Sequence, residues 1–175
     1  MGMELKSNIL LVGLEENFNK RLSKKLSGEL GMQYVNVREL VEYELVDEKN
    51  VLEQGGIEYY KKRERKALKR AAGFENTIID ISYDFLTNNF TVFETDSIKL
   101  YIRFPKEMLG LKKEDLSEIS FEDRDNWLVK CSDFVILNTK KDIKSCMANI
   151  YNQLEDSLND EINQEKYKLF KSGGC

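Results

Sequence analysis

Short apolar runs alternate along this chain with longer segments of mixed polarity. Runs rich in Ile, Val, Leu and Tyr occupy residues 8–12, 33–37, 77–81, 98–103 and 133–138. Runs of this length that are apolar on both sides are typical of parallel strands covered by helices on both faces. The pattern therefore predicts an α/β fold with three α/β/α layers and a five-stranded parallel sheet.

Helical periodicity fills the segments between these runs. The first such segment has apolar residues at four-residue spacing, Phe18, Leu22, Leu26 and Leu30, and ends at Gly31. Further helices are expected around residues 40–44, over 57–72, from a capping box at Ser120 to about Cys131, and from about Asp142. No linker-like stretch divides the chain, so we predict one domain over 1–163 and a flexible tail over 164–175.

Composition narrows the class of protein only modestly. The chain has 175 residues, of which 33% are charged and 41% hydrophobic, and it has no apolar run long enough to cross a membrane. Its three scattered cysteines are typical of reduced thiols, so we predict a cytoplasmic protein without a membrane partner. The chain contains no His, which excludes His-based acid–base catalysis and His metal ligands.

One segment is strongly basic although the whole chain carries a net charge of −4. Residues 61–70 hold seven basic residues and one acidic residue. Such a run is either an anion or nucleic-acid surface or the solvated side of a helix. The sequence favours the solvated helix, so we expect a protein partner or a small anion rather than nucleic acid.

The first strand and helix resemble the opening of a P-loop kinase that lacks its phosphate-binding residues. That motif is G-x-x-x-x-G-K-[ST], in which backbone N–H groups and the Lys hold phosphates and the hydroxyl holds magnesium. Counted from Gly13, the last three positions of the motif are Phe18, Asn19 and Lys20. Phe18 does not easily adopt the left-handed backbone open to Gly, Asn19 has no charge, and Lys20 cannot ligate a cation.

Further matches make the resemblance specific to one family. Residues 8–158 resemble shikimate kinase, a small member of the nucleoside monophosphate kinase-like P-loop group. Gly56 to Glu64 keep that family's spacing of glycine, aromatic residue, basic residue and glutamate, and Val41-Glu42 keeps its hydrophobic–acidic pair. The resemblance implies the strand order 2-3-1-4-5 and an ATP-dependent phosphotransferase with Mg-ATP as its cofactor.

Most positions that would contact the acceptor differ from the family pattern. Arg38 stands where an Asp is expected, Lys61 replaces an Arg, and Arg124 matches an Arg. The family's glycine turn after the third strand is missing, and its Arg-bearing lid would fall in 106–119, which contains no Arg. The resemblance thus keeps the packing positions and loses the ligand-binding ones.

Two possible replacements for the lost groups remain open. Lys20 and Arg21 could supply the missing phosphate cation, although Glu15 and Glu16 place two negative charges in the same loop. Asp80, at the end of the third strand, could hold a magnesium-bound water or could cap the following turn.

Three functions follow from these observations. The favoured one is a non-catalytic pseudokinase with a binding, regulatory or assembly role, which needs no cofactor. The alternative is an active small-molecule kinase that uses Mg-ATP, with Lys20 or Arg21 and Asp80 in the site. A receiver-like signalling module is a minor alternative, suggested by Asp80 at the end of a central strand.

Overall fold

A computed structural model describes residues 8–44, 48–92, 97–109 and 120–156. The chain forms two compact units, Met1–Lys141 and Asp142–Cys175. The first unit holds the sheet. In the second unit, residues 143–156 are helical, as predicted for a helix beginning near Asp142. The Ser145 N–H donates to the Asp142 carboxylate at 2.8 Å at the start of this helix. The expected single domain over 1–163 stays a prediction, and the expected tail over 164–175 lies outside the described residues.

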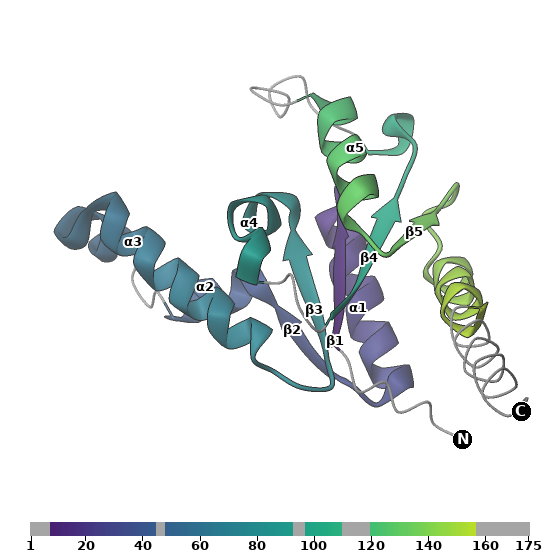
Figure 1. Cartoon of the computed structure of the whole chain (residues 1–175), viewed down its shortest axis with the longest axis horizontal. Coiled ribbons are helices and arrows are strands. Elements are labelled where there is room, and N and C mark those ends of the chain that lie inside the picture. The colour runs from purple at the N-terminus through teal and green to yellow at the C-terminus, as the bar shows by residue number, and fades with distance from the viewer. Residues whose placement is uncertain (1–7, 45–47, 93–96, 110–119, 157–175) are drawn as a thin grey trace, which may run out of the picture. The chain divides into compact units, whose positions relative to one another are not determined.

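The five predicted strands are confirmed. They are β1 (Asn8–Gly13), β2 (Gln33–Asn36), β3 (Thr77–Ser82), β4 (Ser97–Arg103) and β5 (Phe134–Leu137). All neighbouring strands pair in parallel, in the order β2-β3-β1-β4-β5 (Figure 1). The order that the resemblance implied is therefore correct. It differs from the 2-1-3-4-5 order of receiver domains, so the receiver-like alternative is wrong.

The helices of this unit lie between the strands in sequence. They are α1 (Glu16–Leu30), α2 (Val37–Glu44), α3 (Glu48–Ala72), α4 (Tyr83–Asn88) and α5 (Phe121–Cys131), with short 3₁₀ turns η1 (Phe90–Val92) and η2 (Lys106–Met108). At the start of α5 the Ser120 hydroxyl accepts a hydrogen bond from the Asp123 N–H at 3.2 Å, which confirms the predicted cap. Within α3, Gly56 has a φ of 72°, a conformation that interrupts the helix and that other residues rarely adopt.

Alternate strand residues face opposite sides of the sheet, and each side has its own apolar contacts. Leu10, Val12, Ile79, Ile81 and Tyr101 form one core with residues of α2, α3, α4 and α5. The intervening residues face the side on which α1 lies (Figure 1). Because Asp80 lies between Ile79 and Ile81, its carboxylate faces the α1 side at the carboxyl end of the sheet.

Candidate functional site

The carboxyl ends of β1, β2 and β3 form the place where a parallel α/β sheet normally binds its ligand. Here β1 ends at Gly13, β2 ends at Asn36, and β3 ends with Asp80, Ile81 and Ser82. Asn36 and Asp80 are direct neighbours in the β2–β3 register. The structure therefore places Asn36 beside Asp80, the metal candidate from the sequence.

The segment between β1 and α1 is too short to be a phosphate-binding loop. β1 ends at Gly13 and α1 begins at Glu16, so only Leu14 and Glu15 connect them. A P-loop needs four residues between its glycines and exposes their backbone N–H groups to phosphate. The motif positions Phe18, Asn19 and Lys20 lie within α1 instead of in a loop, which sequence counting alone did not predict.

Phe18 and Asn19 are both buried beneath the start of α1. The Phe18 ring packs edge-on against Phe104, with 4.9 Å between ring centroids. Asn19 is 1% exposed, and its backbone N–H donates to the Glu15 carbonyl at 3.0 Å, a helical hydrogen bond. Asn19 also explains Gly13, because a Cβ at Gly13 would lie 2.5 Å from the Asn19 Nδ2 atom. At the motif position where a P-loop has its phosphate-binding lysine, this chain thus has the buried side-chain amide of Asn19.

Asp80 is buried and held by two residues of β2. The Asn36 Nδ2 donates to its carboxylate at 2.7 Å and the Tyr34 hydroxyl donates at 3.4 Å. Burial raises the pKa of the Asp80 carboxyl to about 6, although the two hydrogen bonds and the nearby Lys20 favour its ionised form. Both donors belong to β2, so these two bonds tie the carboxyl end of β3 to the neighbouring strand.

Asn36 also connects this carboxylate to the next helix. Its Oδ1 accepts a hydrogen bond from the Glu39 N–H at 3.0 Å, so it caps the first turn of α2. Arg38, which stands where the family pattern has an Asp, follows Asn36 by two residues. Asn36 therefore joins β2, β3 and α2 through its side-chain amide.

Ion pairs hold one of the two candidate replacements for the P-loop lysine, Lys20, and also hold Arg38. Lys20 of α1 pairs with Glu39 of α2, and this contact raises the Lys20 pKa. Arg38 of α2 pairs with Glu16 of α1 at 3.3 Å, and Arg21 is exposed on α1. Glu15 pairs with Lys141 at 2.7 Å. Lys20 and Arg38 are therefore each balanced by a glutamate, whereas Arg21, the other candidate for the phosphate cation, has no ion-pair partner among the described residues.

The remaining space at this site is very small. A cavity of about 20 Å³ is lined by Glu16, Asn19, Asn36, Arg38, Asp80, Ile81 and Ser82. That volume is enough for about one water molecule. The Asn19 Oδ1 atom is buried and has no hydrogen-bond partner among the described residues, which suits a site for one water. Neither a nucleotide nor a hydroxylated acid fits such a cavity.

Magnesium also has little support here. Among the described residues no group of three or more His, Cys, Asp or Glu side chains is placed to hold a metal ion. Lys20 occupies the hydroxyl position of the motif and pairs with Glu39. Asp80, the weak metal candidate from the sequence, would have to bind an ion that normally keeps several waters, in space for about one. The space beside Asp80 is thus smaller than a hydrated magnesium ion requires.

The three substrate-like positions do not converge on one pocket. Arg38 lines the small cavity and its guanidinium lies 5.6 Å from the Phe85 ring centre. The Arg124 guanidinium lies 5.2 Å from the Tyr83 ring centre, and its buried Nε has no hydrogen-bond partner among the described residues. Lys61 lines a different pocket. Of the expected lid, 106–109 are described and contain η2, whereas 110–119 lie outside the described residues.

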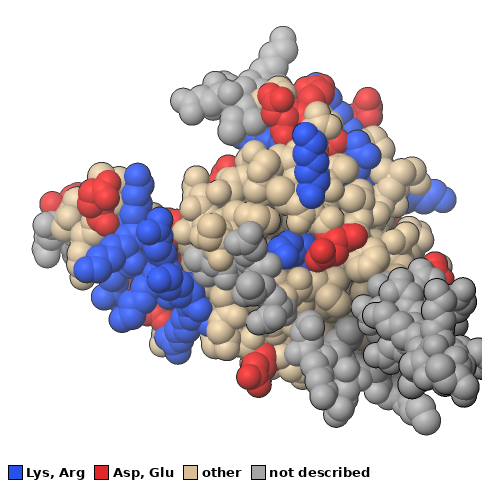
Figure 2. Space-filling view, in the orientation of Figure 1, with Lys and Arg blue, Asp and Glu red and all other residues tan. Residues whose placement is uncertain are grey.

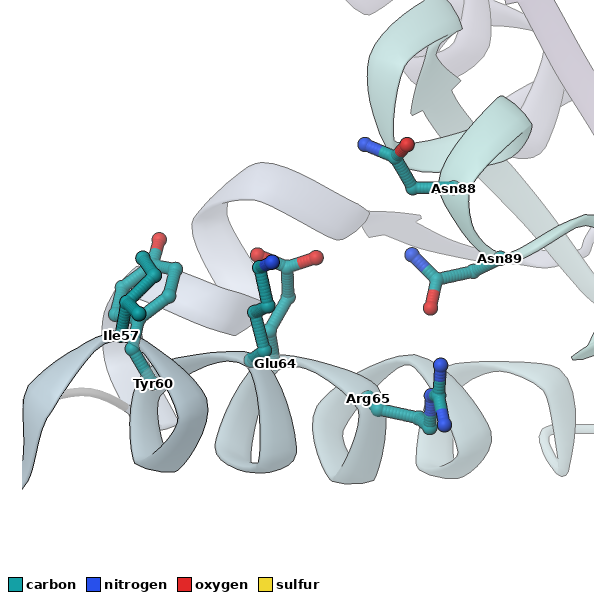
Figure 3. A pocket seen from close by; sticks show the side chains of 7 residues that line it. Ile57, Tyr60, Glu64, Arg65, Asn88 and Asn89 are labelled. Atoms are coloured by element: carbon teal, nitrogen blue, oxygen red, sulfur yellow. The ribbon is translucent and has the colours of Figure 1, made fainter.

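The pocket at Lys61 lies between α3 and the turn after α4 (Figure 3). It measures about 360 Å³ and is lined by Ile57, Tyr60, Lys61, Glu64, Arg65, Asn88 and Asn89. Glu64 points from α3 toward Asn89, and burial raises the pKa of its carboxyl while the Asn89 hydrogen bond lowers it. Sequence reasoning noted Glu64 only as part of the family spacing and missed Asn88 and Asn89, because these residues come together only when α3 and the end of α4 line the same pocket.

Solved structures of known proteins share this architecture, although their sequences differ widely from this one. No protein-family model matches the chain, and no curated protein sequence matches it. Among solved structures it is similar to the shikimate kinase of Aquifex aeolicus, with 20% identity, a TM-score of 0.66, and coverage of 86% of this chain and 98% of that one. The shikimate kinase of Acinetobacter baumannii, solved in complex with shikimate, has 15% identity, a TM-score of 0.65, and coverage of 89% and 97%.

A dephospho-CoA kinase from Campylobacter jejuni is also similar, with 14% identity, a TM-score of 0.51, and coverage of 86% of this chain and 98% of that one. The fold is that of the P-loop kinases. More particularly, it is a shikimate kinase-like P-loop kinase fold. The described residues contain no helix long and apolar enough to cross a membrane.

Proposed function

We propose that this protein is a non-catalytic relative of the P-loop kinases and acts by binding rather than by phosphoryl transfer. The observation that carries the proposal is the start of α1 at Glu16, directly after the Leu14-Glu15 connection. A helix in this place uses the Asn19 N–H for its own hydrogen bond, at 3.0 Å to the Glu15 carbonyl. Backbone donors used in this way cannot also form a phosphate cradle.

The charges around the site support the same conclusion. Phosphoryl transfer depends almost wholly on positioning and on stabilising negative charge in the transition state. Lys20 acts on the Asp80 carboxyl electrostatically and Arg38 lines the same small cavity, and each already pairs with a glutamate. A single lost charged hydrogen bond to phosphate costs about 1.5–3 kcal/mol, or at least about tenfold in affinity. We therefore expect a cytoplasmic pseudokinase with a regulatory or assembly role.

Calorimetry with Mg-ATP tests this proposal directly. We expect no saturable heat in the micromolar range and no phosphorylation of shikimate in a coupled assay. The shikimate kinase from Aquifex aeolicus, run in parallel, serves as the positive control for both measurements. A micromolar dissociation constant for Mg-ATP would favour the active-kinase alternative. In that event, loss of binding in Lys20→Met or Arg21→Met would identify the cation that replaced the P-loop lysine.

A further inference from the structure

The basic segment of α3 forms a continuous surface. Lys and Arg side chains gather over α3 in the space-filling view (Figure 2). Residues 61–70 carry a net charge of +6 in a chain of net charge −4, so the rest of the chain carries −10. The positive charge of this protein is therefore concentrated on one helix.

Most of these basic groups are not neutralised. Arg63 donates to the Glu44 carbonyl at 3.0 Å, and Arg70 pairs with the Glu44 carboxylate. The others have no ion-pair partner among the described residues; they are Lys61, Lys62, Arg65, Lys66 and Lys69. A solvated helix of the ordinary kind places Glu or Asp one turn from Lys or Arg. Here Glu58 and Glu64 are so placed, which leaves residues 61–70 with far more positive than negative charge.

An aromatic ring belongs to the same surface. Tyr59 is 45% exposed, and with Lys62, Arg63, Arg65, Lys66 and Lys69 it lines a hollow of about 430 Å³. From Tyr59 to Lys69 the helix rises about 15 Å. A groove of this length can follow a short stretch of a single strand.

We propose that this face of α3, which we name the α3 basic face and define as Tyr59, Lys62, Arg65, Lys66 and Lys69, binds single-stranded nucleic acid. Phosphates would contact the Lys and Arg side chains, and a base would stack on the Tyr59 ring. A positive groove combined with an exposed aromatic ring is the usual means of binding single strands without sequence preference. The structure thus adds unpaired charge and an aromatic ring to a run that the sequence alone assigned to solvent.

Other polyanions fit this surface less well. An acidic peptide supplies charges but no flat ring to stack on Tyr59. An anionic membrane needs an apolar helix face to insert, and the apolar face of α3 is already buried through Ala67, Leu68 and Ala71. Glu58 and Glu64 are the acidic neighbours on this part of the helix, and Glu64 lines the separate pocket with Asn89.

Fluorescence anisotropy of the full chain with a labelled oligothymidylate of about 16 nucleotides tests the proposal. The test variant carries Lys62→Gln, Lys66→Gln and Lys69→Gln. The matched control carries the same charge change at exposed lysines elsewhere, Lys130→Gln, Lys140→Gln and Lys144→Gln. A third variant, Tyr59→Ala, removes the ring without changing the charge, and a variant with Arg in place of the three α3 lysines tests rescue.

We expect a dissociation constant of about 10⁻⁴–10⁻⁶ M near physiological salt, tightening as salt falls. The α3 variant should bind at least about tenfold more weakly, and its log–log salt dependence should be shallower by about 2, since each lost phosphate contact on a single strand accounts for about 0.7. The control and the Arg variant should retain binding. Tyr59→Ala should lose about tenfold for the single strand and little for a duplex.

Several results would overturn the proposal. The first is that the oligothymidylate does not bind at about 50 mM salt. The second is that the α3 variant and the control variant lose equal affinity. The third is that a duplex binds more tightly than the single strand and Tyr59→Ala has no effect. Stronger competition by polyglutamate or by phosphatidylserine vesicles would assign the surface to an acidic protein or a membrane instead. This inference gives the proposed non-catalytic role a partner. Because Mg-ATP calorimetry and anisotropy are separate measurements, either proposal can fail without the other.

Discussion

Replacing the buried carboxyl of Asp80 should stabilise the protein at neutral pH. Asp80 is 5% exposed, and burial raises its pKa from 3.8 to about 6. Each pKa unit corresponds to about 1.36 kcal/mol, so ionisation of this group in the folded protein costs up to about 3 kcal/mol at pH 7. Asp80→Asn removes that cost and keeps an oxygen to accept from the Asn36 Nδ2.

The sign of the pH dependence follows from the raised pKa. Between pH 3.8 and about 6 the folded protein binds more protons at Asp80 than the unfolded chain does. The contribution of Asp80 to stability is therefore fully present below about pH 3.8 and is lost as the pH rises through about 6. The advantage of Asp80→Asn should be near zero at the acid end of this window and reach its full size above it.

Urea unfolding at a series of pH values measures this difference. We expect the free energy of unfolding of Asp80→Asn to exceed that of the wild type by about 2–3 kcal/mol at pH 7. Glu75→Gln is a suitable control because Glu75 is exposed, and it should change the stability by less than about 0.5 kcal/mol at any pH. An Asp80→Asn protein less stable than the wild type at pH 7 would refute the reasoning, since the carboxylate would then be stabilising.

Two further predictions concern packing. Asp125 accepts hydrogen bonds from the Tyr101 hydroxyl at 2.7 Å and from the Arg103 guanidinium at 2.6 and 2.8 Å. Asp125→Ala should lower the free energy of unfolding in urea by about 1–3 kcal/mol, because it leaves the buried Tyr101 hydroxyl unpaired. A loss below about 0.5 kcal/mol would contradict this. Restoring the P-loop residues should not restore Mg-ATP binding. Thermal melts without ligand should show a large loss of stability, because Phe18 is buried against Phe104. A rise in the melting temperature of this variant with Mg-ATP would contradict the expectation. That variant carries Phe18→Gly, Asn19→Lys and Lys20→Ser.

The fold was predictable because its signals are local or repeated. Each strand is a short apolar run, and α1 shows its buried stripe at four-residue spacing, with Leu22 and Leu26 fully buried. The capping box at Ser120 was visible for the same reason. The strand order came from the resemblance rather than from the pattern, since apolar runs alone do not determine which strands pair with each other.

The site was predictable only in its parts. Sequence counting identified Asn19, Lys20 and Asp80, and the structure brings all three to the carboxyl end of β1 and β3. It could not predict that Lys20 pairs with Glu39, or that Arg38 pairs with Glu16. Such pairs depend on how two helices approach, which no spacing along the chain specifies. The pocket at Lys61 depends in the same way on the packing of α3 against α4.

The start of α1 explains why the site lost its chemistry as a whole. A P-loop stays open because glycine at its sixth position disfavours helix, and here that position is Phe18, which packs on Phe104. Burial of this ring favours extension of α1 back to Glu16, so the Asn19 N–H then bonds within the helix. The phosphate-binding groups of the motif are therefore changed in the backbone as well as in the side chains. Adding a lysine at position 19 would therefore place a buried charge in a packed helix, at a residue whose N–H already bonds to the Glu15 carbonyl.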